Sequence, residues 1–209
     1  MHASELWQDT GPASDKRLLK AALESFAERG YHGTTTREIS QRAGMSPAAI
    51  YMHYKSKDEL LFLIMRITLE EALRRLRESF DAQPDPLDRV FELVKTVVSF
   101  NAEWHIAARV ANHEVLALTG KRREQIRAIR RQIEDVIGEA IQLGIDAGQL
   151  HVEDIRATIF AILSMAIGVS RWFSPDGRLT PDELGVLYAR IVLRMLDAHH
   201  QTRRRVSVG

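Results

Sequence analysis

Apolar residues recur along the chain at spacings of three and four, which is the period of one face of an α-helix. Alternation of apolar and polar residues, which would indicate half-buried strands, is absent over any useful length. Turn-forming residues divide this pattern, and they lie at Gly30, Gly33, Gly44, Pro84, Pro86, Gly120, Gly148 and 174–177. The pattern predicts an all-α protein of about nine helices without internal repeats.

Several predicted helices begin with a capping box, in which a hydroxyl and a carboxylate three residues later satisfy free backbone N–H groups. The pairs are Thr35 with Glu38, Ser56 with Glu59, and Thr180 with Glu183. Pro47 and Pro181 each follow a hydroxyl residue, and we expect both at the first helical position, where proline loses no hydrogen bond. We expect the first helix to start after Ser14 and a long helix to cover about 57–80.

The composition is typical of a soluble globular protein, because the 209 residues are 45% hydrophobic and 27% charged. No apolar run approaches the roughly 18 residues that a membrane span needs, so we expect no membrane partner. The N-terminus lacks the basic start and apolar stretch of a signal peptide, which predicts a cytoplasmic protein. The absence of cysteine excludes disulfides, cysteine-ligated zinc and cysteine nucleophiles.

The net charge of +1 argues against a protein that coats itself with nucleic acid, so any DNA contact must come from a local patch. Enzyme motifs are absent, including G-x-S-x-G, H-E-x-x-H, the P-loop and the dinucleotide fingerprint, so the sequence does not support an enzyme. His105 and His113 have no carboxylate at a clear ligand spacing. We therefore expect neither a metal site nor a cofactor.

The segment 34–51 carries the most informative pattern. A short helix, a tight turn at Gly44 and a second short helix that starts with Ser46 and Pro47 follow one another. Glycine suits a turn that needs a positive φ angle. The residues spaced to face inward are Ile39, Ala43, Met45 and Ile50. This layout is typical of a helix-turn-helix, whose second helix enters the major groove of DNA.

The chemistry of this segment suits DNA. The exposed face of the second helix is expected to carry Ser46, Pro47, Ala48, Ala49 and Tyr51. Small residues let a backbone approach base edges, and alanines contact thymine methyl groups. Arg37 is expected to reach a guanine edge or a phosphate. Candidate phosphate partners are Thr35, Thr36, Tyr51, His53, Tyr54, Lys55 and Lys57. A lone tyrosine, histidine or lysine in this region is more often a solvated surface residue, but the ordered set predicts DNA binding.

Residues 14–65 resemble the signature of TetR-family regulators, and the matching stretches are 18–31, 33–39, 43–46 and 50–61. The resemblance implies an all-helical homodimer that represses transcription at a palindromic, double-stranded operator and leaves it when a small molecule binds. It also implies that Tyr51, His53, Tyr54 and Lys57 contact phosphates. We expect a disordered arm (1–13), a helix-turn-helix domain (14–56), a helical ligand-binding and dimerisation domain (57–200) and a basic tail (201–209).

The larger C-terminal region is predicted to hold the small molecule. Residues 91–118 are mostly apolar with a few polar groups among them, as in ligand pockets. The expected ligand-binding residues are Phe62, Arg66, Phe91, Trp104, His105, Arg109, Asn112, Met165 and Trp172. Two alternatives stay open: Arg109 pairs with Glu103 or Glu114 in an ordinary salt bridge, and the apolar residues form core instead of a cavity.

Residues 170–184 and the long helix 122–147 are similar to those of a subset of TetR-type regulators, several of which sense acyl-CoA thioesters. This resemblance implies an acyl-CoA thioester or a related lipophilic anion as the effector. Arg66, Arg109 and Arg171 would then lie near its phosphates.

The last two helices, expected at about 152–172 and 180–198, carry wide apolar stripes that need a cover. A two-fold partner would supply that cover as a four-helix interface. The expected interface residues are Ile159, Leu163, Ile167, Leu187, Ile191 and Met195. A wholly intramolecular arrangement remains open, as does the alternative function of an architectural or ligand-independent helix-turn-helix DNA-binding protein.

Overall fold

The computed structural model describes residues 6–7 and 12–196. Within these residues there are nine α-helices, a short 3-10 turn and no strand, which confirms the all-α prediction. The elements are α1 (Ala13–Arg29), α2 (Thr36–Arg42), α3 (Ala49–His53), α4 (Lys57–Ala82), α5 (Pro86–Glu103), α6 (His105–His113), η2 (Val115–Ala117), α7 (Gly120–Asp146), α8 (Ile155–Trp172) and α9 (Pro181–Met195).

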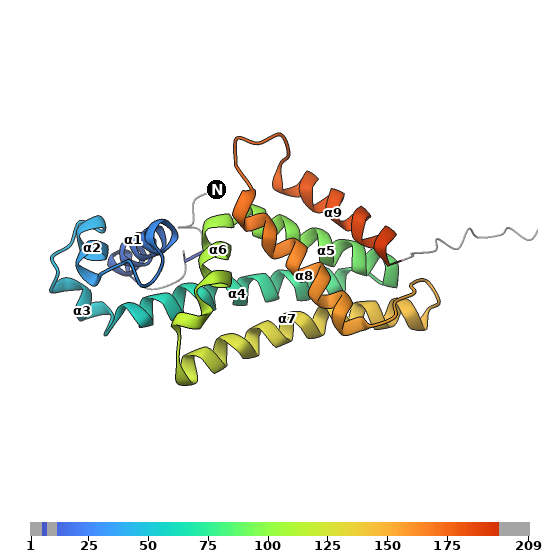
Figure 1. The fold of residues 1–209 in the computed structure, drawn as a ribbon, viewed down its shortest axis with the longest axis horizontal. Helices are drawn as coiled ribbons and strands as arrows, with labels where there is room; N and C mark the ends of the chain where they lie inside the picture. Colours follow the sequence, from blue (N-terminus) through green and yellow to red (C-terminus); the bar gives the residue numbers. More distant parts are fainter. Residues whose placement is uncertain (1–5, 8–11, 197–209) are drawn as a thin grey trace, which may run out of the picture.

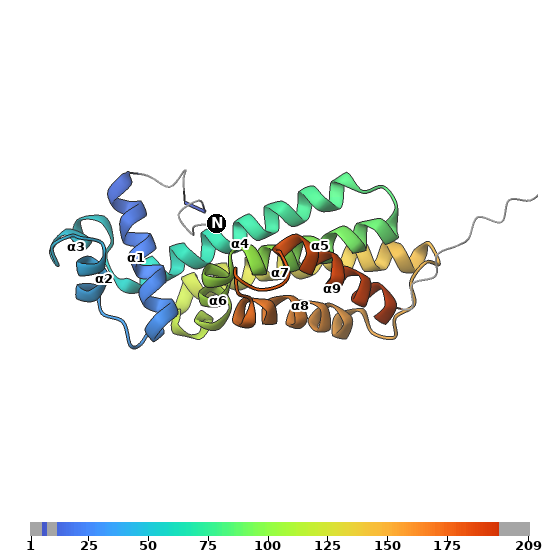
Figure 2. The same ribbon diagram turned by 90° about the horizontal axis from the view of Figure 1, so that it is seen from above.

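The molecule is elongated, with α1, α2 and α3 gathered at one end (Figure 1). Helix α4 starts beside α3 and runs into the larger bundle, where it packs against α5, α6 and α7. Helices α5 and α9 pack against each other along the bundle (Figure 2). The short α6 contacts both α1 and α8. Both α4 and α6 therefore connect the small N-terminal part to the bundle.

Two helices extend beyond their predicted ends. Helix α1 begins at Ala13, and α4 continues to Ala82. Trp7, which falls within the expected arm, is fully buried in the core. The other parts of the arm, 1–5 and 8–11, and the expected basic tail lie outside the described residues.

Helix α3 begins later than predicted, at Ala49 instead of Pro47. The residues before it form a tighter turn, in which Tyr51 N donates to Ala48 O at 3.2 Å. The predicted cap is still recognisable, because Ser46 Oγ accepts a hydrogen bond from Ala49 N at 3.3 Å. Hydrogen bonds between residues three apart, as in a 3-10 helix, therefore close this first turn before the α-helix begins.

The capping boxes of α2 and α9 are present as predicted. In each, the threonine hydroxyl accepts from the backbone N–H of the glutamate, and the glutamate accepts from the threonine N–H. The third box is incomplete. Ser56 accepts from Glu59 N at 3.2 Å, but the Glu59 carboxylate accepts from Lys55 N at 2.7 Å.

A continuous cluster of buried apolar side chains runs from the N-terminal helices into the bundle. Its members include Phe26 in α1 and Met65 in α4, which are 2% and 0% exposed. Gly185 lets α9 lie close to α5, since a Cβ there would be 2.7 Å from Lys95 O and would also clash with Ser99 Oγ. The long helices α4 and α5 therefore form the centre on which the others pack.

Helix α8 is the most apolar long helix in the described part of the chain. By length and composition it could cross a membrane, with a mean hydropathy of 1.3 over 18 residues, and 22% of it is buried. It lies with α9 along one side of the bundle (Figure 2). The outer face of α9 is also apolar, because Leu187, Ile191 and Met195 are 42%, 43% and 48% exposed. Both helices thus expose apolar side chains.

Candidate functional site

The turn at Gly44 joins α2 to α3 and sets the angle between them. Gly44 has a φ of 68°, in the left-handed region where other residues are strained. Ile39 in α2 and Ile50 in α3 are 0% and 1% exposed, so both helices are fixed to the core from below. The opposite face of α3 faces away from the protein and is open to a partner.

The outward face of α3 combines small residues with two large ones. Tyr51 and Met52 are 60% and 86% exposed. The exposed small residues are Ser46, Pro47 and Ala48, while Ala49 is half-buried. The Tyr51 hydroxyl lies 3.1 Å from Thr36 Oγ1, which joins α3 to the start of α2. Sequence reasoning included Tyr51 but passed over Met52, which lies one helical turn after Ala48 on the same face.

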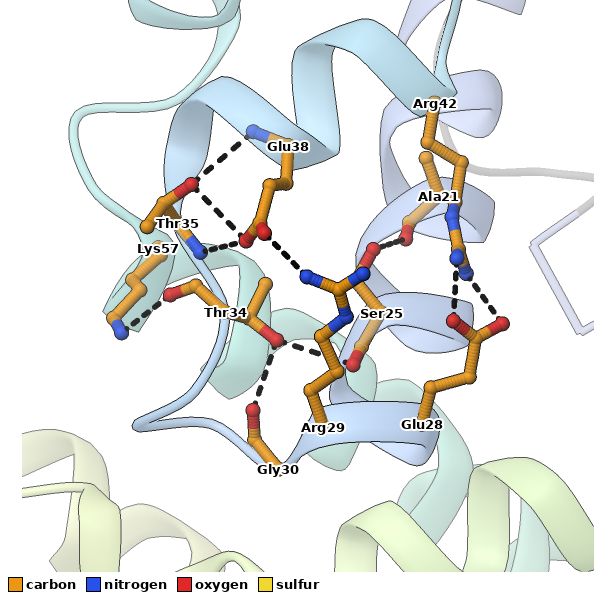
Figure 3. Close-up of polar contacts among 10 residues, drawn as sticks. All are labelled: Ala21, Ser25, Glu28, Arg29, Gly30, Thr34, Thr35, Glu38, Arg42 and Lys57. Atoms are coloured by element: carbon orange, nitrogen blue, oxygen red, sulfur yellow. Dashed lines mark hydrogen bonds and ion pairs between the residues drawn. The ribbon is translucent and has the colours of Figure 1, made fainter.

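Ion pairs and hydrogen bonds hold α2 against α1 (Figure 3). Arg42 forms a bidentate pair with Glu28, with N–O distances of 2.8 and 2.5 Å. Arg29 pairs at 2.5 Å with Glu38, the carboxylate of the α2 capping box. The pKa of Glu38 is lowered, chiefly because the backbone N–H of Thr35 donates to its carboxylate. These contacts fix the direction of α2 and therefore the position of α3.

Lys57 is the first residue of α4, and the N-terminal helices hold its ammonium group. Its Nζ donates to Tyr31 O and Thr34 O, both at 2.8 Å, and lies 4.2 Å from the centre of the Tyr31 ring. An ammonium has three N–H donors, so one remains for a further acceptor. Lys57 therefore ties α4 to the segment between α1 and α2.

The neighbours His53 and Tyr54 point in different directions. His53 is exposed at the end of α3, and its Nδ1 lies 2.7 Å from Asp15 Oδ1 of α1. Tyr54 is 7% exposed and belongs to the core, and burial raises the pKa of its hydroxyl. The two rings therefore face different surroundings, although the resemblance implies that both contact phosphates. Arg37 is exposed and forms no ion pair with any residue that the structure describes.

A cavity of about 80 Å³ lies inside the larger bundle. Five helices, α4 to α8, contribute to its walls, which are mostly apolar. The polar side chains in its lining belong to Thr68, Asn101, Asn112, Arg130 and Glu134. An apolar pocket with a few placed polar groups is typical of small-molecule sites.

Arg130 of α7 is the unusual group in this lining. Its Nη2 donates to Ala111 O at 2.8 Å and to Asn112 Oδ1 at 3.3 Å. Its Nε is buried and has no acceptor among the described residues. Burial lowers the pKa of the guanidinium. Sequence reasoning missed Arg130, because it lies in a helix rich in arginine and nothing local distinguishes it from its neighbours.

Two family models match the chain. Residues 18–64 match the model for bacterial regulatory proteins of the tetR family, and residues 83–196 match the tetracyclin repressor-like C-terminal domain. The chain belongs to the TetR family. The helix-turn-helix is therefore the DNA-binding element of a transcriptional regulator, as the sequence predicts.

The relatives of this TetR-family chain are regulators, not enzymes. The transcriptional repressor KstR2 of Mycobacterium tuberculosis is 31% identical over 183 residues, which cover 84% of this chain and 89% of that protein. The structure of that KstR2, described as a ketosteroid transcriptional regulator, has a TM-score of 0.84 at 26% identity and covers 91% of this chain and 98% of that chain.

Two further solved structures have the same fold over nearly their whole length. A tetR-family protein from Rhodococcus RHA1 has a TM-score of 0.85 at 34% identity, covering 91% of this chain and 100% of that chain. AibR in complex with isovaleryl coenzyme A and operator DNA has a TM-score of 0.78 at 25% identity, covering 89% of this chain and 100% of that chain.

The cavity of this TetR-family chain overlaps little with the ligand-binding residues expected from the sequence. Of these, Asn112 lines the cavity. Arg109 lines a separate cleft between α1, α6 and α8 together with Arg171, and His105 lines another near the start of α9. The other expected ligand-binding residues also lie outside the cavity lining, and they are Phe62, Arg66, Phe91, Trp104, Met165 and Trp172. The periodicity of α6 explains the split, because it directs Ala108, Ala111 and Asn112 to one side and Arg109 to the other.

The alternative salt bridge of Arg109 is not observed. Glu103 pairs instead with Arg75 at 2.8 Å, and Arg109 forms no ion pair with a described residue. His105 Nδ1 lies 3.1 Å from Ala102 O, and its pKa is lowered, chiefly by burial. Within residues 6–7 and 12–196, no group of three acidic or histidine side chains is arranged to hold a metal ion.

The expected interface residues divide between two environments. Leu187, Ile191 and Met195 are exposed on α9. On α8, Leu163 and Ile167 line the cavity, and Ile159 packs beside Gly138 of α7. The large exposed apolar residues of α8 are instead Phe160 and Trp172, at 45% and 56% exposure.

Proposed function

We propose that the chain is a ligand-responsive repressor that binds a palindromic operator as a homodimer and leaves it when a small molecule enters the C-terminal domain. The observation that carries the DNA-binding step is the outward face of α3, where Tyr51 is 60% exposed beside small residues. A helix with such a face can approach base edges in the major groove. The relatives that are transcriptional repressors support repression, and not activation, as the effect on transcription.

The operator contacts divide by role. Ala48, Ala49 and Met52 face base edges, where they meet thymine methyl groups. The backbone phosphates accept hydrogen bonds from Thr35, Thr36, Arg37, Ser46, Tyr51, His53 and Lys57. Pro47 lies in the turn that leads into α3. Phosphate contacts fix the position of the protein, and the contacts to base edges determine which sequence it prefers.

The exposed faces of α8 and α9 form the dimer interface. Phe160 and Trp172 of α8 and Ile191 of α9 are each more than 40% exposed in the single chain. Large apolar side chains exposed on both helices favour an interaction site. A second copy related by a two-fold axis would cover both helices and place the two α3 helices about 34–36 Å apart, in successive major grooves. The same burial accounts for the high hydropathy of α8.

The effector binds in the cavity of the bundle, and α6 transmits its presence. Ala108 and Ala111 of α6 line the cavity, while Val110 lines the cleft shared with Phe26 and Ala27 of α1. A ligand that displaces α6 therefore shifts α1 and with it the DNA-binding domain. Release requires the ligand to bind the displaced state more tightly than the operator-binding state.

The complex of AibR with isovaleryl coenzyme A supports an acyl-CoA thioester or a related lipophilic anion as effector. The bacterial relatives control transcription, which supports a cytoplasmic protein without a membrane partner. We assign the chain to a helix-turn-helix domain over 14–56 and a ligand-binding and dimerisation domain over 57–200.

Selection of bound duplexes from a random pool tests the proposal. We expect an inverted repeat to be recovered, and the Tyr51→Ala variant to bind it at least about tenfold more weakly. Retained binding by that variant, or a pool without any inverted repeat, would contradict the proposed interface. The ligand-independent alternative predicts an operator complex that no acyl-CoA releases, which a gel shift with added thioesters detects.

A further inference from the structure

The size of the cavity limits what it can hold. Its volume of about 80 Å³ is roughly half of the ~150 Å³ that suffices for a benzene ring. On that scale it accepts a chain of about three to four carbon atoms and excludes a fused ring system. The walls are closely packed, with Leu76, Ala108 and Ala111 each at most 2% exposed. A larger occupant would have to force these side chains apart.

Most of the polar side chains that line the cavity have hydrogen-bond partners within the protein. The Asn101 side chain donates to Val97 O at 2.8 Å, and the Thr68 hydroxyl donates to Ile64 O at 2.7 Å. Asn112 uses its Oδ1 to accept from Arg130. The exceptions are Arg130, whose buried Nε–H has no acceptor in the described chain, and the half-buried Glu134, whose carboxylate forms no hydrogen bond with a described residue.

An unpaired buried donor on a charged group is costly, so it favours an occupant with a matching acceptor. Glu134 lies one turn along α7 and also lines the cavity, but it forms no ion pair with Arg130. The contacts of Nη2 with α6 hold the guanidinium in place, so the direction of the free Nε–H is fixed before any ligand arrives. A guanidinium binds carboxylate oxygens especially well, and a carbonyl oxygen can also accept from it.

We infer that the effector presents a short apolar acyl chain to the cavity and that its carboxyl-derived oxygen accepts a hydrogen bond from Arg130. The half-buried lining residues Glu134, Leu163 and Ile167 place the mouth between α7 and α8. Arg127 and Arg131, which are near Arg130 along α7, are exposed. They suit the phosphates of a coenzyme A thioester, while a free short-chain acid would fill the cavity alone.

This inference rests on the proposed effector site, and direct binding tests it without DNA. Calorimetry with the full chain compares butyrate, isovalerate and octanoate, their coenzyme A thioesters, and coenzyme A alone. We expect the short acyl group to bind, and the octanoyl compound to bind at least about tenfold more weakly because it overfills the cavity. Tighter binding of the free acids than of the thioesters identifies the acid as the source, and the reverse identifies the thioester.

Matched variants test the role of Arg130. Arg130→Met removes the donor and keeps most of the side-chain volume, and we expect short acyl compounds to bind about 20-fold more weakly. Arg123→Met is the control, because Arg123 also has a buried Nε without an acceptor in α7 but does not line the cavity. Ala111→Val fills the cavity, and we expect it to abolish binding while circular dichroism shows a folded chain.

The outcomes separate the inference from the proposed function. Short acyl compounds that bind through Arg130 but leave an operator complex intact support the inference and contradict ligand-controlled release. An operator complex released by octanoyl-CoA or by a polycyclic thioester, and not by short acyl compounds, overturns the inference and leaves the repressor function standing. Equal weakening by Arg123→Met and Arg130→Met also overturns it.

Discussion

At the scale of single residues, two lysines of the DNA-binding domain have different surroundings. The ammonium of Lys57 is held by Tyr31 O and Thr34 O, whereas the side chain of Lys55 is exposed and its backbone N–H bonds to Glu59. Both lysines are candidates for phosphate contact from the sequence. Their surroundings predict that Lys57 also stabilises the fold, whereas Lys55 does not.

Lys57→Met should lower the free energy of unfolding by about 1–3 kcal/mol, because two charge-assisted hydrogen bonds are lost and their carbonyl acceptors lose a partner. The control Lys55→Met should change it by less than about 0.5 kcal/mol. Urea unfolding followed by circular dichroism measures both. In gel shifts, Lys55→Met should weaken operator binding and reduce the salt slope by about one if it contacts a phosphate. Equal stability of the two variants would contradict the positioning role of Lys57.

At the scale of elements, α2 and α9 start with the same capping box in different parts of the molecule. In both boxes the glutamate has a lowered pKa, chiefly because a threonine N–H donates to it, and in α2 that glutamate also pairs with Arg29. The α9 box lies in the larger bundle, apart from α1, α2 and α3 (Figure 1). The two capping boxes have the same hydrogen bonds, but we expect only the α2 box to affect DNA binding.

Thr35→Ala and Thr180→Ala should each cost about 1 kcal/mol of stability, the usual cost of a lost N-cap. Only Thr35→Ala should also weaken operator binding, because α2 carries α3. The stabilising effect of the glutamates is present above their ordinary pKa of 4.5 and is lost as the pH falls through the lower folded value. Alanine keeps the backbone N–H that chiefly lowers the pKa of the glutamate and removes only the hydroxyl hydrogen bond, which is the second cause. The stability difference between wild type and either variant should therefore shrink by a small amount under acid, as thermal melts across that range would show. A difference that grows under acid would contradict the assignment.

At the scale of the whole molecule, α8 and α9 leave an apolar surface that the single chain does not cover. We propose that a second copy covers this surface. The resulting dimer carries two DNA-binding domains, which bind the two half-sites of one operator at the same time. Linked binding raises the effective affinity well beyond that of one domain. The elongated shape places this surface far from α3, so dimerisation and DNA contact are separable (Figure 1).

Ile191→Glu should convert the dimer to a monomer, because it puts a charge into the centre of an apolar interface. The control is Leu116→Glu, since Leu116 is 73% exposed in η2, away from α8 and α9. Light scattering after size exclusion should show a halved mass for the first variant and an unchanged mass for the second. Operator affinity should fall with the loss of the dimer, and a dimeric Ile191→Glu variant would contradict the proposed interface.

Local chemistry allowed much of the fold and the DNA-binding end to be predicted. The capping threonines, Gly44 and the sequence from Ser46 to Tyr51 act over three or four residues, so their pattern can be read without knowing what packs above them. The predicted start of α3 was early by two residues, because a proline can begin a tight turn as well as an α-helix. Tyr54 was predicted to contact phosphate, because the neighbouring residues in the sequence do not show that its ring packs into the core.

The cavity depends on contacts between helices that are distant in the chain. Arg109 and Arg130 both lie in helices that line pockets, yet Arg130 faces the cavity and Arg109 faces the cleft beside α1. The difference arises from the rotation of α6 and α7 against α4 and α8, which depends on the packing of all their side chains together. The helix-turn-helix follows from interactions between near neighbours in the chain, whereas the binding groups of the cavity follow from the way the bundle packs.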